Sequence, residues 1–181
     1  MVKFLLIALS LGLSCAHHKS LDISPAEVNG DWHTLYIVAD NVEKVKEGGS
    51  LRAYFQHMEC SDECQTLKIK FNIKVDSECQ TYTVVGEKNE DGKYNTDYAG
   101  KNFFYVVKKT DGVIFFHNVN VDESGKDTNV ILVAGKGKTL SNAQKQELRK
   151  LAREYNMPKE NIQHLVPTGN ITVLHAANEC T

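Results

Sequence analysis

The strongest constraint on the fold is a segment in which apolar and polar residues alternate. Leu67, Ile69, Phe71 and Ile73 are each followed by a lysine or an asparagine. Successive side chains of a β-strand point to opposite faces of a sheet, so this pattern predicts a strand with one apolar and one cationic face.

Seven further segments show similar runs and are separated by polar turns. Together they give eight predicted strands: Trp32–Val38, Leu51–Met58, Leu67–Lys74, Thr81–Val85, Tyr94–Tyr98, Phe103–Lys108, Val113–Asn118 and Asn129–Ala134. Asp-Gly steps at 91–92 and 111–112, and a turn over 122–126, supply the hairpin geometry. Closing eight consecutive strands into a barrel removes both aggregation-prone edges. We therefore expect an all-β protein, an eight-stranded antiparallel up-and-down β-barrel.

A change of period after the last strand predicts one helix. From Leu140 to Tyr155 the apolar residues fall mostly at helical spacing, and Ser141 with Gln144 forms a capping box. Asn156 and Pro158 end the helix. Because only one face is apolar, we expect this C-terminal α-helix to pack outside the barrel.

The first sixteen residues have the three parts of a secretory signal. Lys3 precedes an apolar run over 4–13, and the small residues Ser14, Cys15 and Ala16 follow. The run is too short to span a bilayer, which needs about 20 residues. We expect a signal peptide over 1–16, and a single secreted, extracellular domain over 17–181.

Charge and composition exclude several partners. The net charge is −2, and removing Lys3 with the leader makes it one unit more negative. A weakly acidic chain without a basic run argues against nucleic acid or membrane insertion. His17 and His18 would begin the mature chain, and we interpret them as a solvated terminus.

Four cysteines remain after the leader: Cys60, Cys64, Cys79 and Cys180. They admit three pairings, and an oxidising compartment favours two bridges. A local Cys60–Cys64 bridge would leave Cys79 and Cys180 to close a loop of about one hundred residues. As half of a metal site, C-x-x-x-C lacks a second close pair, so we expect no metal and no cofactor.

The interior positions determine whether the barrel can hold a ligand. Taking the apolar side of each strand as inward gives the predicted ligand-binding residues Leu51, Ala53, Phe55, Met58, Ile69, Phe71, Val84, Thr96, Tyr98, Phe104, Phe116, Asn118, Val130, Leu132 and Ala134. A filled core would use the same residue types. Ala53, Thr96 and Ala134 are small for a filled core, and Tyr98 and Asn118 bring polar groups that need partners. These features favour a cavity for a small apolar molecule.

The same residues carry a resemblance to a known family. Gly30-Asp31-Trp32 matches the G-x-W signature of the lipocalins, and Cys60-x-x-x-Cys64 resembles the motif of their odorant-binding branch. Nearly the whole mature chain is covered, including 48–52, 100–102, 135–137, the helix, 160–162 and Cys180. The resemblance implies a calyx open at one end that carries odorants or pheromones in a glandular fluid. Several mammalian relatives are inhaled allergens, so allergenicity is an expectation at the family level.

The resemblance also implies roles for individual residues. Trp32 would close the barrel floor beneath Lys136, where many lipocalins have arginine. The disulfides would be Cys60–Cys64 and Cys79–Cys180. One departure is a longer segment before Cys180 that contains Asn170-Ile171-Thr172, an N-glycosylation acceptor. Residues 171–173 could instead add a short strand.

We therefore expect a carrier for a small hydrophobic ligand and no enzyme. No nucleophile elbow, zinc-protease motif or phosphate loop is present. Some lipocalins are isomerases that use a pocket cysteine, but all four mature cysteines are better used as bridges. No spacing pairs any of the histidines that could act as a base: His33, His57, His117, His164 and His175. The alternative functions are a protein-binding scaffold and a pocket-cysteine isomerase, and a homodimer is compatible with the sequence.

Overall fold

The computed structural model describes residues 20–137, 139–165 and 180. The predicted leader, His17, His18, His175, Asn170 and the alternative strand over 171–173 lie outside these residues.

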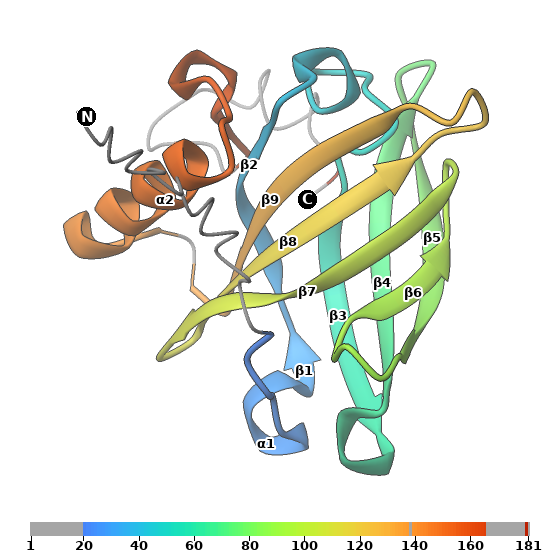
Figure 1. The fold of residues 1–181 in the computed structure, drawn as a ribbon, viewed down its shortest axis with the longest axis vertical. Coiled ribbons are helices and arrows are strands. Elements are labelled where there is room, and N and C mark those ends of the chain that lie inside the picture. Colours follow the sequence, from blue (N-terminus) through green and yellow to red (C-terminus); the bar gives the residue numbers. More distant parts are fainter. Residues whose placement is uncertain (1–19, 138, 166–179, 181) are drawn as a thin grey trace, which may run out of the picture.

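The described chain forms one curled antiparallel sheet with a helix against its outer face (Figure 1). The strands are β1 Gly30–Asp31, β2 His33–Ala39, β3 Tyr54–Ser61, β4 Thr66–Val75, β5 Glu78–Lys88, β6 Tyr94–Asp97, β7 Lys101–Thr110, β8 Val113–Val121, β9 Asp127–Gly135 and β10 Gln163–His164. The helices are α1 Pro25–Val28 and α2 Asn142–Glu154, with helical turns η1 Val42–Lys44, η2 Asp62–Cys64 and η3 Lys159–Asn161. The prediction of an all-β barrel with one C-terminal helix is confirmed.

The number of strands differs from the prediction, and the difference explains how the barrel closes. The first predicted strand, Trp32–Val38, corresponds to β2, which pairs with β9, and the two residues before Trp32 form an additional short strand, β1, which pairs with β3. The continuous segment 30–39 therefore joins both ends of the sheet, and the main-chain N–H of Trp32 donates to Gln56 O at 3.1 Å. Farther along β2, the short β10 pairs with its free edge. Two residues are too few for a periodic signal, so β10 was not predicted.

The predicted strand limits need two larger corrections. β5 extends well beyond Thr81–Val85 because its ladder with β4 runs from Val75↔Glu78 to Thr66↔Glu87. Its ends are polar and gave no apolar signal. The second predicted strand begins at Tyr54 and not at Leu51. A register shift between Phe55 and His57 inserts an extra residue, which lets Phe55 and Met58 share one face of β3.

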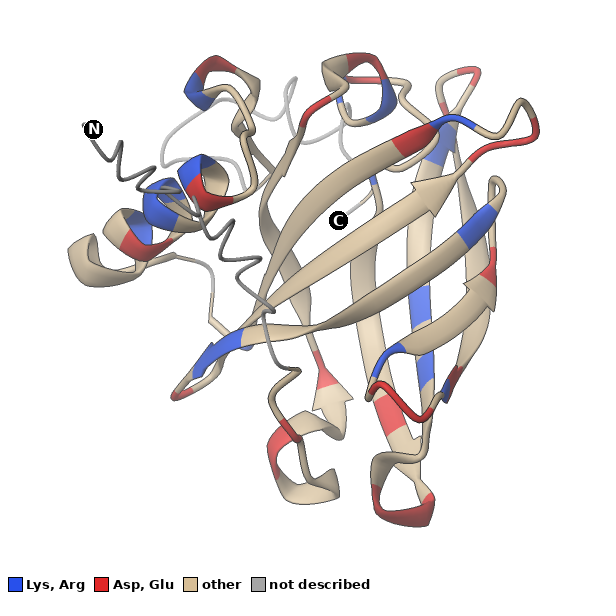
Figure 2. Cartoon of the chain, in the orientation of Figure 1, with Lys and Arg blue, Asp and Glu red and all other residues tan. Residues whose placement is uncertain are grey.

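Helix α2 forms as predicted and covers one wall of the sheet. The main-chain N–H of Gln144 donates to Ser141 Oγ at 3.2 Å, and its side chain accepts from the N–H of Ser141 at 2.8 Å. Leu148, Leu151 and Ala152 are buried in a cluster with residues of β2, β8 and β9. These three strands are thus buried on both faces, and Figure 2 shows the charges of this region on α2, while the ribbon of β8 carries none.

Two disulfides connect distant and local parts of the chain. Cys60 is bonded to Cys64 across η2, and Cys79 at the start of β5 is bonded to Cys180. This is the pairing that the family resemblance implied. The carbonyl oxygen of Cys180 also accepts a hydrogen bond from Asn72 Nδ2 at 3.3 Å. The bridge and this hydrogen bond therefore hold Cys180 beside β5 and β4.

Candidate ligand-binding cavity

The barrel contains an apolar cavity of about 100 Å³. It is lined by residues of β3 to β9 and the segments beside them: Leu51, Ala53, Phe55, Ile69, Phe71, Val84, Thr96, Tyr98, Asn102, Phe104, Phe116, Asn118, Val130 and Leu132. A dry engineered cavity of about 150 Å³ can hold benzene. The cavity of this protein is smaller than that, so it accommodates a molecule of benzene's size or larger only when lining side chains move.

Strand register brings the lining residues together. Ile69 lies opposite Val84, and Phe116 lies opposite Leu132. Directly opposed residues of an antiparallel pair project to the same face, so each pair contributes two side chains to the cavity.

Aromatic rings close the wall of the cavity beside the short ladder between β5 and β6. β5 and β6 pair through only two residues on each strand. Beside this short ladder the Tyr82 and Tyr98 rings lie edge to face at 5.2 Å, and Phe71 packs against Tyr98 at 5.0 Å. Burial, and then the neighbouring Tyr82, raise the pKa of Tyr98 to about 12, so its hydroxyl is neutral near pH 7.

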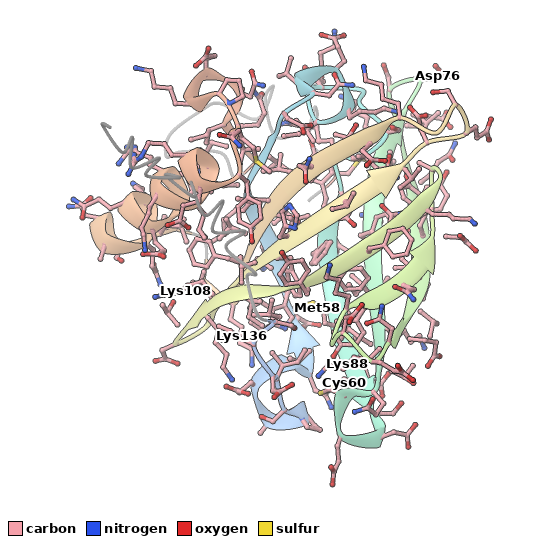
Figure 3. The ribbon with its side chains drawn as sticks, in the orientation of Figure 1. Met58, Cys60, Asp76, Lys88, Lys108 and Lys136 are labelled. Carbon is pink, nitrogen blue, oxygen red and sulfur yellow. A yellow bond between two sulfur atoms is a disulfide. The ribbon has the colours of Figure 1, made fainter. Side chains whose placement is uncertain are left out.

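All predicted ligand-binding residues except Met58 and Ala134 line this cavity. Met58 and Ala134 are fully buried nearer the closed end, where Met58 lies opposite Gly30 and Ala134 lies opposite Thr34. Figure 3 places Met58 toward the same end as Lys136 and away from Asp76. The alternation along each strand predicted that these side chains point inward. Whether an inward side chain lines the cavity or fills the core depends on its position along the barrel axis, which the alternation does not give.

Asn102 is a lining residue that the sequence interpretation missed. The predicted strand began at Phe103, whereas β7 begins at Lys101 and places Asn102 on the same face as Phe104. The alternation with Phe104 was available as a signal, but the predicted strand was started at the first apolar residue, Phe103, and so excluded the polar Asn102.

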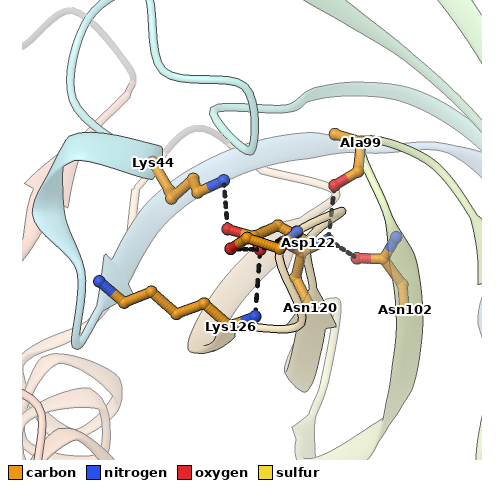
Figure 4. Close-up of polar contacts among 7 residues, drawn as sticks. Lys44, Ala99, Asn102, Asn120, Asp122 and Lys126 are labelled. Atoms are coloured by element: carbon orange, nitrogen blue, oxygen red, sulfur yellow. Dashed lines mark hydrogen bonds and ion pairs between the residues drawn. The ribbon is translucent and has the colours of Figure 1, made fainter.

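Three asparagines form the polar side of the cavity region. Asn102 Nδ2 donates to the carbonyl oxygens of Tyr98 at 2.7 Å and Gly100 at 3.3 Å. Asn102 Oδ1 accepts from Nδ2 of Asn118 at 2.9 Å and from Nδ2 of Asn120 at 3.1 Å. Figure 4 shows Asn102 and Asn120 in this network, close to the β8–β9 turn.

A loop over residues 42–51 lies at the end of the barrel opposite α1 (Figure 1). Its Val45 is fully buried in the core cluster, and Lys44 forms an ion pair with Asp122 at 3.4 Å (Figure 4). Hydrogen bonds from the Ser124 hydroxyl and the Lys126 main chain lower the pKa of Asp122 to about 2. The loop is thus held to the β8–β9 turn by a carboxylate that stays ionised at neutral pH.

The opposite end is closed by Trp32. The Trp32 side chain is almost fully buried, and its Nε1–H donates to the carbonyl oxygen of Val28 at 2.6 Å. Lys136 Nζ lies 5.2 Å from the centre of the Trp32 ring, a cation–π distance. These contacts link α1, β1 and the end of β9.

Among the described residues, neither a histidine nor a cysteine lines the cavity. His57 pairs with Asp31 at 2.8 Å on the surface, and His117 stacks on Tyr155 at 4.1 Å. His164 packs against Tyr36, and its pKa is lowered by burial and by Lys145. Within the described ranges, no group of three or more potential ligands could hold a metal ion. In the same part of the chain, no helix is long and apolar enough to cross a membrane.

These features define a class of protein: a small β-barrel with one closed end and an apolar internal cavity. A family model described as the lipocalin / cytosolic fatty-acid binding protein family matches residues 29–169. The chain belongs to this family.

Individual relatives agree with this assignment. The chain is 76% identical over 168 residues to an odorant-binding protein of Rattus norvegicus, covering 93% of this chain and 97% of that one. It is 62% identical over 170 residues to a female-specific lacrimal gland protein of Mesocricetus auratus, covering 94% and 98%.

Solved structures show the same fold. The structure of an odorant-binding protein, OBP1, matches with a TM-score of 0.80 and 79% identity over 83% of this chain and 97% of that one. A bovine odorant-binding protein in complex with a selenium-containing odorant matches with a TM-score of 0.58 and 29% identity, covering 79% and 94%. The rat relative and both solved structures are thus named as odorant-binding proteins, and the bovine structure contains an odorant.

Proposed function

We propose that this protein is an extracellular carrier that binds a small hydrophobic or volatile molecule, an odorant or pheromone, in the barrel cavity. The observation that carries the proposal is the apolar cavity, whose lining includes nearly all the residues that strand parity predicts to point inward. Apolar walls with a few convergent polar groups are typical of small-molecule sites.

Relatives support the ligand class and the secretion. The rat relative is an odorant-binding protein, the hamster relative is a lacrimal gland protein, and the bovine structure contains an odorant. The predicted leader over 1–16 and the two disulfides fit an oxidising, extracellular compartment.

The proposal excludes catalysis by a cavity thiol. The mature cysteines are joined in two disulfides, and an oxidised sulfur is not a nucleophile. A protein-binding scaffold remains the competing function, and it requires no entry of a ligand into the barrel.

Two neighbouring valines provide a matched test. Val84 lines the cavity, whereas Val85 is 48% exposed on the opposite face of β5. In the mature protein, binding of the fluorescent probe 1-aminoanthracene would be titrated for the wild type and for the Val84→Phe and Val85→Phe variants. The added ring of Val84→Phe takes up space that the probe must occupy. Fitting extra bulk into a packed interior typically costs about 1–3 kcal/mol, so we expect this variant to bind the probe about tenfold or more weakly.

The control has the same added bulk outside the barrel. We expect Val85→Phe to bind the probe like the wild type, and both variants to keep the far-ultraviolet circular dichroism of β-sheet. Absence of probe binding to the wild type, or equal weakening by both variants, would contradict the carrier proposal and favour the protein-binding scaffold.

A further inference from the structure

Strand β5 has two edges, and the described chain pairs only one of them along its length. On one side the ladder with β4 runs from Glu78 to Glu87. On the other side the ladder with β6 contains only Glu87 and Lys88. Figure 3 labels Asp76, just before the strand, and Lys88, its last residue, which mark the two ends of this edge. Most of the edge of β5 that faces β6 is therefore unpaired within the described residues.

The ladder with β4 shows which main-chain groups lie on the unpaired edge. The N–H of Lys88 donates to the carbonyl oxygen of Gln65, beside β4, at 2.8 Å. Successive residues of an antiparallel strand direct their main-chain groups to alternate edges, so the even-numbered residues of β5 face β4. The odd-numbered residues face the other way, as the pairing of Glu87 with Asn95 on β6 requires. The unpaired main-chain N–H and C=O groups are those of Cys79, Thr81, Thr83 and Val85.

This stretch lacks the features that usually protect the edge of a sheet. Residues 79–86 contain no charged side chain and no proline, and threonine and valine account for half of them. Val85 is 48% exposed and, with Leu21, is one of the two exposed large hydrophobic side chains of the described residues. Natural edge strands commonly carry lysine or proline, and an edge of β-branched residues without them is a template for another strand.

The cavity is closed at this place without using the edge. The rings of Tyr82 and Tyr98 lie 5.2 Å apart, Tyr98 lines the cavity, and Tyr82 packs against the same core cluster. Side chains thus seal the interior where the ladder between β5 and β6 ends. The main-chain groups of the edge remain available to a strand that approaches from outside.

A second copy of β5 matches this edge. Two identical strands paired antiparallel are related by a two-fold axis, and each presents the same pattern of donors and acceptors. With the axis at Tyr82, Thr81 lies opposite Thr83 of the second copy, and every unpaired residue is used without disturbing the ladder with β6. The same register brings Asp76 of each copy toward Lys88 of the other, so opposite charges meet at both ends and an uncharged stretch meets itself.

We propose that two copies of this chain associate through residues 79–85 of β5, which extend both sheets into one. Each pair of facing residues exchanges two main-chain hydrogen bonds, so the interface contains about eight. The surface fits a second copy of the chain, and the proposal does not depend on the carrier function.

The first test is the oligomeric state of the mature protein. Sedimentation velocity from about 1 to about 500 μM covers the dissociation constants of weak interfaces, and we expect a reversible equilibrium between monomer and dimer. Thr83→Pro removes an N–H that faces the unpaired edge and none that faces β4. It should raise the dissociation constant at least about tenfold, because two hydrogen bonds are lost per dimer.

A second variant has a matched control and does not rely on proline being tolerated. Val85→Lys places a charge beside the edge, as natural edge strands do, and should also raise the dissociation constant at least about tenfold. Leu21→Lys adds the same charge at the other exposed hydrophobic side chain, outside β5, and should dimerise like the wild type. Far-ultraviolet circular dichroism would verify that each variant keeps its β-sheet.

Amide hydrogen exchange followed by nuclear magnetic resonance locates the interface. The amides of Thr81 and Thr83 face the unpaired edge, so they should exchange fast in dilute protein and slowly in concentrated protein. The amides of Tyr82 and Val84 face β4 and should be protected at both concentrations.

Three results would overturn the proposal. One is a wild type that stays monomeric at the highest concentration, and another is a dimer that neither Thr83→Pro nor Val85→Lys weakens. The third is exchange of the Thr81 and Thr83 amides that does not depend on protein concentration. Slow exchange of these amides in the dilute monomer is included there, since it would mean that the same chain covers the edge.

Discussion

The two disulfides close loops of very different length, and we expect them to differ accordingly in their contribution to stability. The bonded residues are four positions apart in Cys60–Cys64 and 101 positions apart in Cys79–Cys180. A bridge restricts the unfolded chain, and in the chain-entropy model its effect grows with the logarithm of loop length. The model assigns about 1.9 kcal/mol to the short loop and about 4.7 kcal/mol to the long one at 25 °C.

Double substitutions by alanine remove each bridge separately. Cys60 and Cys64 are both buried, whereas the long bridge joins the buried Cys180 to the exposed Cys79. The variant without the short bridge loses two buried sulfurs, and the variant without the long bridge loses one. The expected difference between the two variants in lost unfolding free energy therefore narrows from about 2.8 to about 2 kcal/mol. The Cys79→Ala/Cys180→Ala variant should remain the less stable of the two.

Urea unfolding provides two independent readouts. Trp32, the only tryptophan, reports the transition through its fluorescence. Loss of the long bridge should also raise the dependence of the unfolding free energy on urea, because the unfolded chain becomes less compact, while loss of the short bridge should not. Equal losses, or a larger loss in Cys60→Ala/Cys64→Ala, would refute the loop-length reasoning.

Three further predictions concern the cavity and its two ends. A Cβ at Gly86 would lie 2.9 Å from Phe104 Cζ, so Gly86→Ala should push this ring into the cavity and weaken 1-aminoanthracene binding, whereas Gly137→Ala, with no heavy atom within 4 Å, should not; unchanged binding in Gly86→Ala would contradict this. Trp32→Phe should lower the free energy of unfolding by at least about 1–3 kcal/mol, because the buried carbonyl of Val28 loses its donor. Lys136→Met should lower it by only about 0.5–2 kcal/mol, because only the cation–π contact is lost. Urea unfolding followed by circular dichroism measures both values, and the reverse order would contradict this prediction. The pKa of Asp122 is lowered from 3.8 to about 2 in the folded protein, so the contribution of its carboxylate to the free energy of unfolding is complete above about pH 4 and is lost as the pH falls through about 2. The stability difference between the wild type and Asp122→Asn should therefore shrink over that range. A difference that stays constant with pH would contradict this role of Asp122.

Most residues of the cavity lining could be predicted, because side chains alternate between the two faces of a strand and this alternation can be recognised from neighbouring residues alone. Once Leu67 to Ile73 is assigned to a strand, Ile69 and Phe71 must share a face, and the same rule orders the other strands. The bulge in β3 did not disturb the prediction, because Phe55 and Met58 were both assigned inward from their apolar character. Asn102 was not predicted, because it is polar and because β7 begins two residues before Phe103, the first apolar residue of the strand.

The sequence by itself determined the strand pattern, the capped helix and the set of inward residues, since each depends on the chemistry of neighbours within a few positions. Tertiary structure decided the rest: that the segment around Trp32 pairs with both β3 and β9, that Met58 and Ala134 lie below the cavity, and that Asn102 accepts a hydrogen bond from Asn118. These features depend on contacts between residues far apart in the chain, and on position along the barrel axis, about which a repeating local pattern contains no information.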